Sequence, residues 1–158
     1  MRKSTVATAT AMPLLLAGGL LLITGCQSEK DALKSDKADL SVSGAYLPQP
    51  AMTDMAAAYL IVKNDGGTAD RLTSVTSPLS GDITMHTTEG SQMKHAGELE
   101  VPANGELKLA RGGTHLMLGK LDHKPQVGEK VEFTLHFATS GAVKVQVPVE
   151  SATFRPEG

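Results

Sequence analysis

A histidine and a methionine stand two residues apart, directly after a pair of glycines. Residues 112–118 read Gly-Gly-Thr-His-Leu-Met-Leu. Because side chains two residues apart on a strand share a face, His115 and Met117 are expected on one face and Leu116 and Leu118 on the other. The leucines suit the core. An imidazole and a thioether are therefore left side by side on the outer face, where a packing methionine has little reason to be.

Two upstream residues could join this pair. His86 ends a segment, Ile83-Thr84-Met85-His86, that is expected to be a strand. Met93 follows in the polar sequence Ser91-Gln92-Met93, which we expect to be a loop, and it has no apolar neighbour in sequence. Each residue could have an ordinary structural role. Taken together, they predict a set of two histidines and two methionines: His86, Met93, His115 and Met117.

A set of two imidazoles and two thioethers is selective for soft metal ions. Thioethers are neutral and favour Cu(I) over Zn, Mg or Ca, and imidazole adds affinity. The ligand set carries no charge and includes no thiolate, so it lacks the Cu–thiolate bond of a blue-copper centre. We therefore expect a shallow Cu(I) site in which Cu(II) is held less well.

The other histidines and methionines allow several interpretations. His95 lies two residues beyond Met93 and could serve either as a spare or alternate ligand or as an ordinary side chain. Met85 shares the strand phase of Ile83, which indicates the core. Met52 and Met55 are either packing or gate residues, or part of a path for copper. Two histidines are expected to be ordinary surface side chains: His123 and His136.

Period-two patterns dominate the sequence that must position these residues. Apolar residues alternate with polar ones over 131–137 and again over 143–149, and 58–62 is a short apolar run. Turn signals separate the segments at 48–50, 64–67, 104–105, 112–113, 126–128 and 140–141. No stretch of ten or more residues beyond residue 40 keeps a helical period. Many short strands with closely spaced turns predict an all-β, antiparallel sandwich or barrel.

The N-terminus has the features of a targeting segment. Arg2 and Lys3 precede an apolar stretch over residues 14–23, which is too short to be a stable membrane anchor. Ile23-Thr24-Gly25-Cys26 follows and resembles the lipobox of bacterial lipoproteins, in which the cysteine is lipidated and becomes the new N-terminus. Residues 1–25 are thus expected to be a signal peptide, the alternative being an ordinary leader that ends near a cysteine. Lipid on Cys26 would tether the protein to the outer face of the cell membrane.

The segment after the cysteine is polar and of mixed charge. Residues 27–40 contain no aromatic or β-branched side chain, so they cannot bury enough apolar surface to become ordered. We expect residues 26–40 to be the lipidated cysteine and a flexible tether, with a short surface helix as the alternative. The remaining residues, 41–158, then form one domain.

Composition excludes several classes of protein. The chain of 158 residues has a net charge of −2, no tryptophan and five other aromatic residues (two Tyr, three Phe), which argues against nucleic-acid binding. Its single cysteine excludes an intrachain disulfide, a Cys-x-x-Cys pair and a cysteine-based zinc site. Hydrolase, zinc-protease and phosphate-loop motifs are missing, so an enzyme is not expected.

The spacing of these motifs resembles that of the PCuAC family of extracytoplasmic copper(I) chaperones. In that family a histidine is followed by a methionine, twenty-one residues and His-x-Met, and here residues 94–114 separate Met93 from His115. Segments 64–72 and 99–105 are similar to family patterns as well, so the likeness covers roughly residues 40–150. This chain departs from the family in having Thr87 after His86, a shorter spacing to Met93 and no Met- or His-rich tail.

The resemblance implies a cupredoxin-like fold with Greek-key connections. It also implies a copper(I) chaperone that delivers its ion by ligand exchange towards the CuA centre of cytochrome c oxidase. The partners would be oxidase subunit II, a Sco-type thiol chaperone, or both, and the protein is expected to be a monomer. Two alternatives stay open: a copper storage or resistance lipoprotein using the same site, and an envelope interaction domain that binds no metal.

Overall fold

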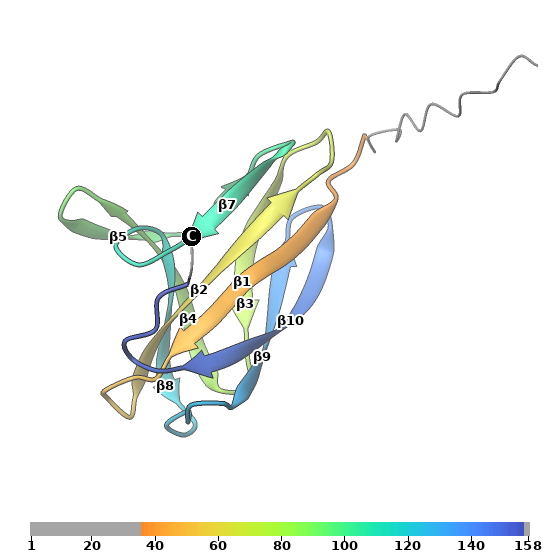
Figure 1. The fold of residues 1–158 in the computed structure, drawn as a ribbon. Helices are drawn as coiled ribbons and strands as arrows, with labels where there is room; N and C mark the ends of the chain where they lie inside the picture. The colour runs from red at the N-terminus through yellow and green to blue at the C-terminus, as the bar shows by residue number, and fades with distance from the viewer. Residues whose placement is uncertain (1–35, 157–158) are drawn as a thin grey trace, which may run out of the picture. The chain divides into compact units, whose positions relative to one another are not determined.

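The computed structural model describes residues 36–156 and contains no helix within them (Figure 1). The all-β class predicted from the period-two pattern is therefore confirmed. Ten strands follow one another: β1 (Leu40–Pro48), β2 (Met55–Asn64), β3 (Asp70–Thr76), β4 (Ser80–Glu89), β5 (Gln92–Ala96), β6 (Leu99–Val101), β7 (Gly105–Leu109), β8 (His115–Leu121), β9 (Lys130–Phe137) and β10 (Gly141–Glu150).

The strands form one continuous hydrogen-bonded order, β5-β4-β8-β2-β1-β10-β9-β3-β6, and β7 pairs with β2 in addition. Only the β1–β10 pairing is parallel among these strands, and it links a β5-β4-β8-β2-β1 half to a β10-β9-β3-β6 half. The two halves pack over a shared core (Figure 1). Consequently β8 lies inside the first half, bonded to β4 on one side and to β2 on the other.

The core is built from alternate residues of strands in both halves. On β9 the burial alternates residue by residue, and Phe133 and Leu135 are fully buried. On β8 the buried pair is Leu116 and Leu118, and on β2 Leu60 lies in the same cluster. The alternation predicted for residues 131–137 and the core face predicted for β8 are thus confirmed.

The predicted turns occur where the sequence placed them. Asn104 has φ 52°, Gly112 has φ 78°, Gly128 has φ 89° and Gly141 has φ 78°. These are left-handed backbone conformations that glycine and asparagine adopt at low cost. The Gly112 turn is the important one for function because β8 begins three residues later.

The chain just before β1 belongs to the domain's packing. The buried side chain of Asn64 accepts hydrogen bonds from the N–H of Asp39 and of Gly66, each at 3.0 Å, and donates one to the carbonyl of Thr68 at 2.8 Å. The N–H of Asp65 also donates to the Asp39 carbonyl at 2.9 Å. Residues 36–39, which fall in the segment predicted to be a tether, are thus hydrogen-bonded to the turn after β2.

Several expectations for the N-terminal region lie outside the described residues. They are the signal peptide over residues 1–25, lipidation of Cys26 and the flexible segment up to residue 35. Between residues 36 and 156 there is no helix long and apolar enough to cross a membrane.

Candidate metal site

The pairing of β4 with β8 brings two predicted ligands together. His86 on β4 lies directly opposite His115 on β8. Their ring centroids are 5.7 Å apart and the ring planes differ by 16°, so the imidazoles are stacked. Since directly opposed residues of an antiparallel pair share a face, both rings lie on the outer face of this half of the sheet.

His115 is oriented by the turn that precedes it. The N–H of Gly113 donates to the Ala110 carbonyl at 3.0 Å, which closes the turn after β7. Nδ1 of His115 then lies 2.8 Å from the Gly113 carbonyl oxygen. A carbonyl can only accept, so Nδ1 carries the proton, and in the neutral ring Nε2 keeps its lone pair. His115 therefore offers Nε2 to a metal from a fixed ring, although only 8% of its surface is exposed.

His86 is held in its neutral form by its surroundings. Its pKa lies below the ordinary value of 6.5 because burial disfavours the charged ring, with further contributions from His115 and His95. Nε2 is 2.9 Å from the hydroxyl of Thr84, two residues back on the same face of β4. A neutral ring is the form that binds metals, so this environment prepares His86 for that role at neutral pH.

Met117 occupies the position predicted for it beside His115. Leu116 and Leu118 are fully buried, whereas Met117 is partly exposed. Met117 lies opposite Thr84 on β4 and opposite Ala57 on β2. The thioether is thus on the same sheet face as the two imidazoles, two residues along β8 from His115.

Met93 lies on a strand, which corrects the predicted loop. β4 continues past His86 to Glu89, the chain turns at Gly90, whose φ is 62°, and β5 returns beside it. Glu89 pairs with Gln92 across this two-residue turn. The hairpin was missed because β5 is almost wholly exposed and so lacks an apolar alternation. A glycine between two short polar segments was the available signal.

The hairpin places Met93 diagonally from His86. Met93 is opposite Thr88, two residues beyond His86 on the same face, and 55% of its surface is exposed. Met93 therefore approaches the imidazoles from the exposed β5 side, which we call the rim of the site.

The residue directly opposite His86 on β5 is His95. The two ring centroids are 5.8 Å apart and the rings are nearly perpendicular, at 85°. His95, His86 and His115 thus form a row across three neighbouring strands. Within residues 36–156, however, no three His, Cys, Asp or Glu side chains are grouped closely enough to hold a metal ion.

The remaining methionines separate into two groups. Met85 is buried in the core, as its strand phase predicted. Met52 and Met55 are exposed and line a groove of about 290 Å³. The groove also includes Met117, so it adjoins the candidate site.

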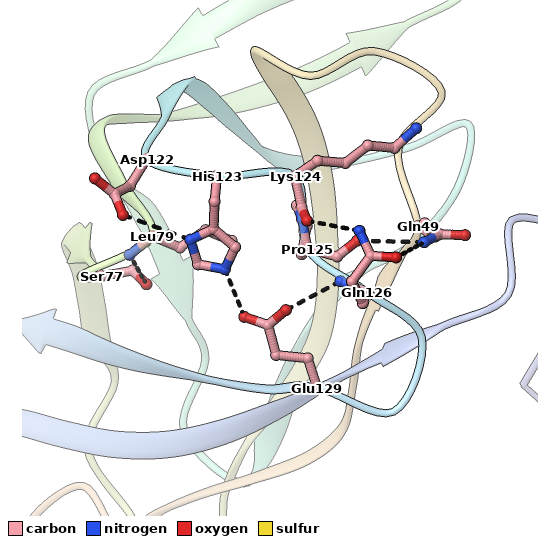
Figure 2. Close-up of polar contacts among 9 residues, drawn as sticks. All are labelled: Gln49, Ser77, Leu79, Asp122, His123, Lys124, Pro125, Gln126 and Glu129. Carbon is pink, nitrogen blue, oxygen red and sulfur yellow. Dashed lines mark hydrogen bonds and ion pairs between the residues drawn. The ribbon is translucent and has the colours of Figure 1, made fainter.

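The surface histidine His123 has more partners than the sequence indicated (Figure 2). Its Nε2 is 2.8 Å from a carboxylate oxygen of Glu129, and its Nδ1 is 3.5 Å from Asp122. Glu129 also accepts a hydrogen bond from the N–H of Gln126 at 3.0 Å. The hydrogen bonds to Glu129 and Asp122 raise the pKa of His123. This cluster lies within the loop between β8 and β9, apart from the candidate site. His136 also lies apart from that site and contacts the hydroxyl of Thr76 at 3.1 Å.

Known proteins are similar to this chain in sequence. The family described as "Putative lipoprotein LpqE-like" matches residues 40–149. A protein of Leifsonia xyli subsp. xyli, named "Putative lipoprotein Lxx21020", is 32% identical over 145 residues, which cover 85% of this chain and 86% of that protein.

Solved structures of PCuAC domains are similar to this chain. The copper-bound PCuAC domain from PmoF2 is 25% identical and superposes with a TM-score of 0.63, covering 71% of this chain and 92% of that domain. The solution structure of the Cu(I) form of DR1885 from Deinococcus radiodurans is also 25% identical, with a TM-score of 0.63 over 80% of this chain and 87% of that one.

Proposed function

Starting from the fact that this chain belongs to the LpqE-like family and has the cupredoxin-like fold of PCuAC domains, we propose that it is a copper(I) chaperone. It binds Cu(I) through His86, Met93, His115 and Met117 and passes the ion on by ligand exchange. The protein's role is binding and transfer, and no reaction is catalysed.

The observation that carries this proposal is the stacked pair of His86 and His115. The two rings lie 5.7 Å apart, and the Gly113 carbonyl fixes the tautomer of His115. A ligating histidine usually donates its other ring N–H to a carbonyl or carboxylate, which is the arrangement found here. Similar solved domains include one described as copper-bound and one as a Cu(I) form.

The two thioethers complete the proposed ligand set. Met117 shares the face of the imidazoles, and Met93 reaches them by moving from its exposed position at the rim. The set is neutral and soft, which favours Cu(I) over harder ions and over Cu(II). Because an ion on this face is accessible from one side, an incoming ligand of a partner protein can attack it before all of its bonds here are broken.

We further propose where the protein works and what it meets. Membership of a family named for lipoproteins supports lipidation at Cys26 and attachment to the outer face of the cell membrane. The acceptor is the CuA centre of cytochrome c oxidase, reached through subunit II, a Sco-type thiol chaperone, or both. The protein acts as a monomer, with residues 27–35 as the tether between the lipid and the domain.

An anaerobic Cu(I) titration against a chromogenic Cu(I) chelator tests the binding site. The full chain with Cys26→Ser is used, since this change removes the only thiol. We expect tight binding of one equivalent by this chain and its loss in a His115→Ala/Met117→Ala variant. His136→Ala, which changes a histidine away from the site, serves as the control and should bind normally. If neither chain competes with the chelator, the copper proposal fails and a metal-free interaction domain is favoured.

A deletion strain distinguishes delivery from storage. Loss of oxidase activity that added copper restores supports the chaperone role. Sensitivity to excess copper with normal oxidase assembly would instead support a storage or resistance protein.

A further inference from the structure

A methionine-lined groove adjoins the proposed copper site on the outer sheet face. It is formed by the β1–β2 loop, the start of β2, β8 and the chain beyond β10. Met52, Met55 and Met117 contribute to its lining, and Met117 is also a proposed copper ligand. The groove therefore shares one sulfur with the primary site.

Two of these methionines are unusually exposed. Met52 has 60% and Met55 has 41% of its surface exposed. Only two other large apolar side chains among residues 36–156 are comparably exposed, Met93 and Val127. Burial of a methionine side chain is favourable, so packing does not explain why these two thioethers remain in solvent.

The strand register fixes Met55 close to Met117. Ala57 lies opposite Met117, and Met55 is two residues earlier on the same face of β2. Met55 is therefore the diagonal neighbour of Met117, at a separation of about 7–8 Å between such positions, which long side chains can bridge. Met52 lies three residues upstream in the loop and lines the same groove.

The rest of the lining disfavours hard cations. None of the twelve lining residues is an aspartate or a glutamate. Arg111 adds a positive charge and is held over the ring of Tyr59, at 5.6 Å from the ring centroid. Mg, Ca and Zn ions would find neither a carboxylate nor an imidazole here, whereas a soft monovalent cation needs only thioether sulfur.

We propose that Met52, Met55 and Met117 form a second, weaker site for Cu(I) or Ag(I) that loads and unloads the primary site. The inference rests on the proposed function, because it gives Met117 a place in both ligand sets. The ion enters on Met52 and Met55, gains Met117, and then exchanges the outer sulfurs for His115 and His86. Gain of Met117 adds one metal–sulfur bond, and each later exchange breaks one metal–sulfur bond as it forms one metal–nitrogen bond, so no electron or proton needs to be supplied.

Methionine-methyl NMR during an Ag(I) titration tests this site. The sample is the full chain with Cys26→Ser and ¹³C-labelled methionine methyl groups, and Ag(I) is a redox-inert substitute for Cu(I). We expect the first equivalent to shift the Met93 and Met117 methyl signals. With Met117 bound to that first ion, further Ag(I) is held by Met52 and Met55 and shifts their signals. If the Met52 and Met55 signals stay fixed throughout, the second site does not exist.

Leucine and alanine variants distinguish a metal site from an apolar docking surface. Met52→Leu/Met55→Leu removes the sulfurs but keeps the groove apolar. We expect it to lose the second equivalent, keep the first, and transfer Cu(I) to a chelator about tenfold more slowly, which is the effect of about 1.4 kcal/mol on the barrier. Val127→Ala, which alters an exposed apolar side chain outside the groove, should behave as the parent. Met52→Ala/Met55→Ala removes both the sulfurs and the apolar surface. If this alanine pair slows transfer and the leucine pair does not, the groove is an apolar docking surface and the proposal is wrong.

Failure of this inference can be told from failure of the proposed function. The ring signals of His86 and His115 report the primary site in the same titration. If those rings respond and Met52 and Met55 do not, only the second site is lost. If Met52 and Met55 respond and the rings do not, the proposed function fails while a thioether site stands.

Discussion

Thr88 and His115 share one hydrogen-bond acceptor, the carbonyl oxygen of Gly113. The hydroxyl of Thr88 donates to it at 3.1 Å, and Nδ1 of His115 lies 2.8 Å from it. β4 and β8 are thereby joined by side chains at the same level as the His86–His115 pair. This carbonyl orients the ring of His115 and links β4 to the turn before β8.

The shared carbonyl predicts a role for Thr88 in copper affinity. Thr88→Val keeps the shape and removes the hydroxyl, so the Gly113 carbonyl loses one of its two donors. We expect the Cu(I) affinity to fall by about tenfold, as is typical when an outer partner of a ligating histidine is removed. Competition with a chromogenic chelator measures the change. Thr87→Val, on the opposite face of β4, is the matched control, and an equal loss in both variants would exclude a specific role for the shared carbonyl.

Copper affinity should depend on pH through the histidines. Because the pKa of His86 lies below the ordinary 6.5, its ring is already neutral at pH 7 and protons compete with copper only in more acidic solution. We expect the Cu(I) affinity to be level between about pH 8 and pH 7. It should fall by up to about tenfold per pH unit once the pH is well below the pKa of His86. Affinity that stays constant from pH 7 down to about pH 5 would contradict ligation by histidine.

The positions of Met93 and His95 on β5 predict that only one of two substitutions weakens Cu(I) binding. In the proposed set Met93 is a ligand, so Met93→Leu should weaken Cu(I) binding by at least about tenfold, the lower limit for changes at outer-sphere partners. His95→Gln should leave Cu(I) binding close to that of the parent chain. Chelator competition on both variants decides between the two residues. If His95→Gln strongly weakens Cu(I) binding and Met93→Leu does not, the ligand supplied by β5 is His95 and not Met93.

The His123–Glu129 cluster predicts a pH window of stability (Figure 2). The pKa of His123 is raised by hydrogen bonds to Glu129 and Asp122, and that of Glu129 is lowered by hydrogen bonds from Gln126 and His123. The contribution of His123 is complete below its unfolded pKa near 6.5 and disappears as pH rises through the higher folded value. The contribution of Glu129 is complete above its unfolded pKa near 4.5 and disappears as pH falls through the lower folded value.

Thermal unfolding of His123→Gln measures this effect. The variant should have a lower Tm than the parent chain at pH 5–6 and the same Tm at pH 9. The difference is small because His123 is exposed. A Tm difference that does not change with pH would mean that the charge on His123 contributes nothing.

The close approach of residues 36–39 predicts that Gly66 cannot be replaced. A Cβ at this position would overlap backbone atoms of Lys37 and Asp39. Gly66→Ala should therefore lower the free energy of unfolding by about 2 kcal/mol or more, the range for overpacked sites, and weaken amide protection around Asp39. Gly97→Ala is the control, because nothing lies within 4 Å of its added Cβ. Equal stability of the two variants would show that residues 36–39 are not packed against the turn.

The parts of the fold that alternate in burial could be predicted from the sequence. On β9 and β8 the apolar residues at every second position, such as Phe133 and Leu116, identified both the strand and its core face. The orientation of His115 and Met117 followed, because a strand with a known core face has only one other face. The ligands on β8 were for this reason the best-defined part of the candidate site.

The β4–β5 hairpin could not be predicted in the same way. β5 is exposed on both faces, so its sequence shows no alternation of apolar and polar residues. Met93 was therefore predicted to lie in a loop. The pairing of His86 with His95 depends on the turn at Gly90, and register across a turn is not visible in either strand alone. Thr84 and Thr88 were missed although they share the period of two with His86, because hydroxyl groups on a strand have many ordinary roles.

Because β5 lies at the end of the sheet order, the proposed site has one side where ligands exchange fast and one where they exchange slowly. β8 is bonded along both edges, whereas β5 is bonded to β4 alone, in a hairpin that projects from the sandwich (Figure 1). An ion bound as proposed would lose its bond to Met93 first and its bond to Met117, the ligand shared with the groove, last. The fold would thus set the order of ligand exchange. A coordination position opens first on the β5 side, while the ion stays bound to β8 until a ligand of the acceptor has bound it.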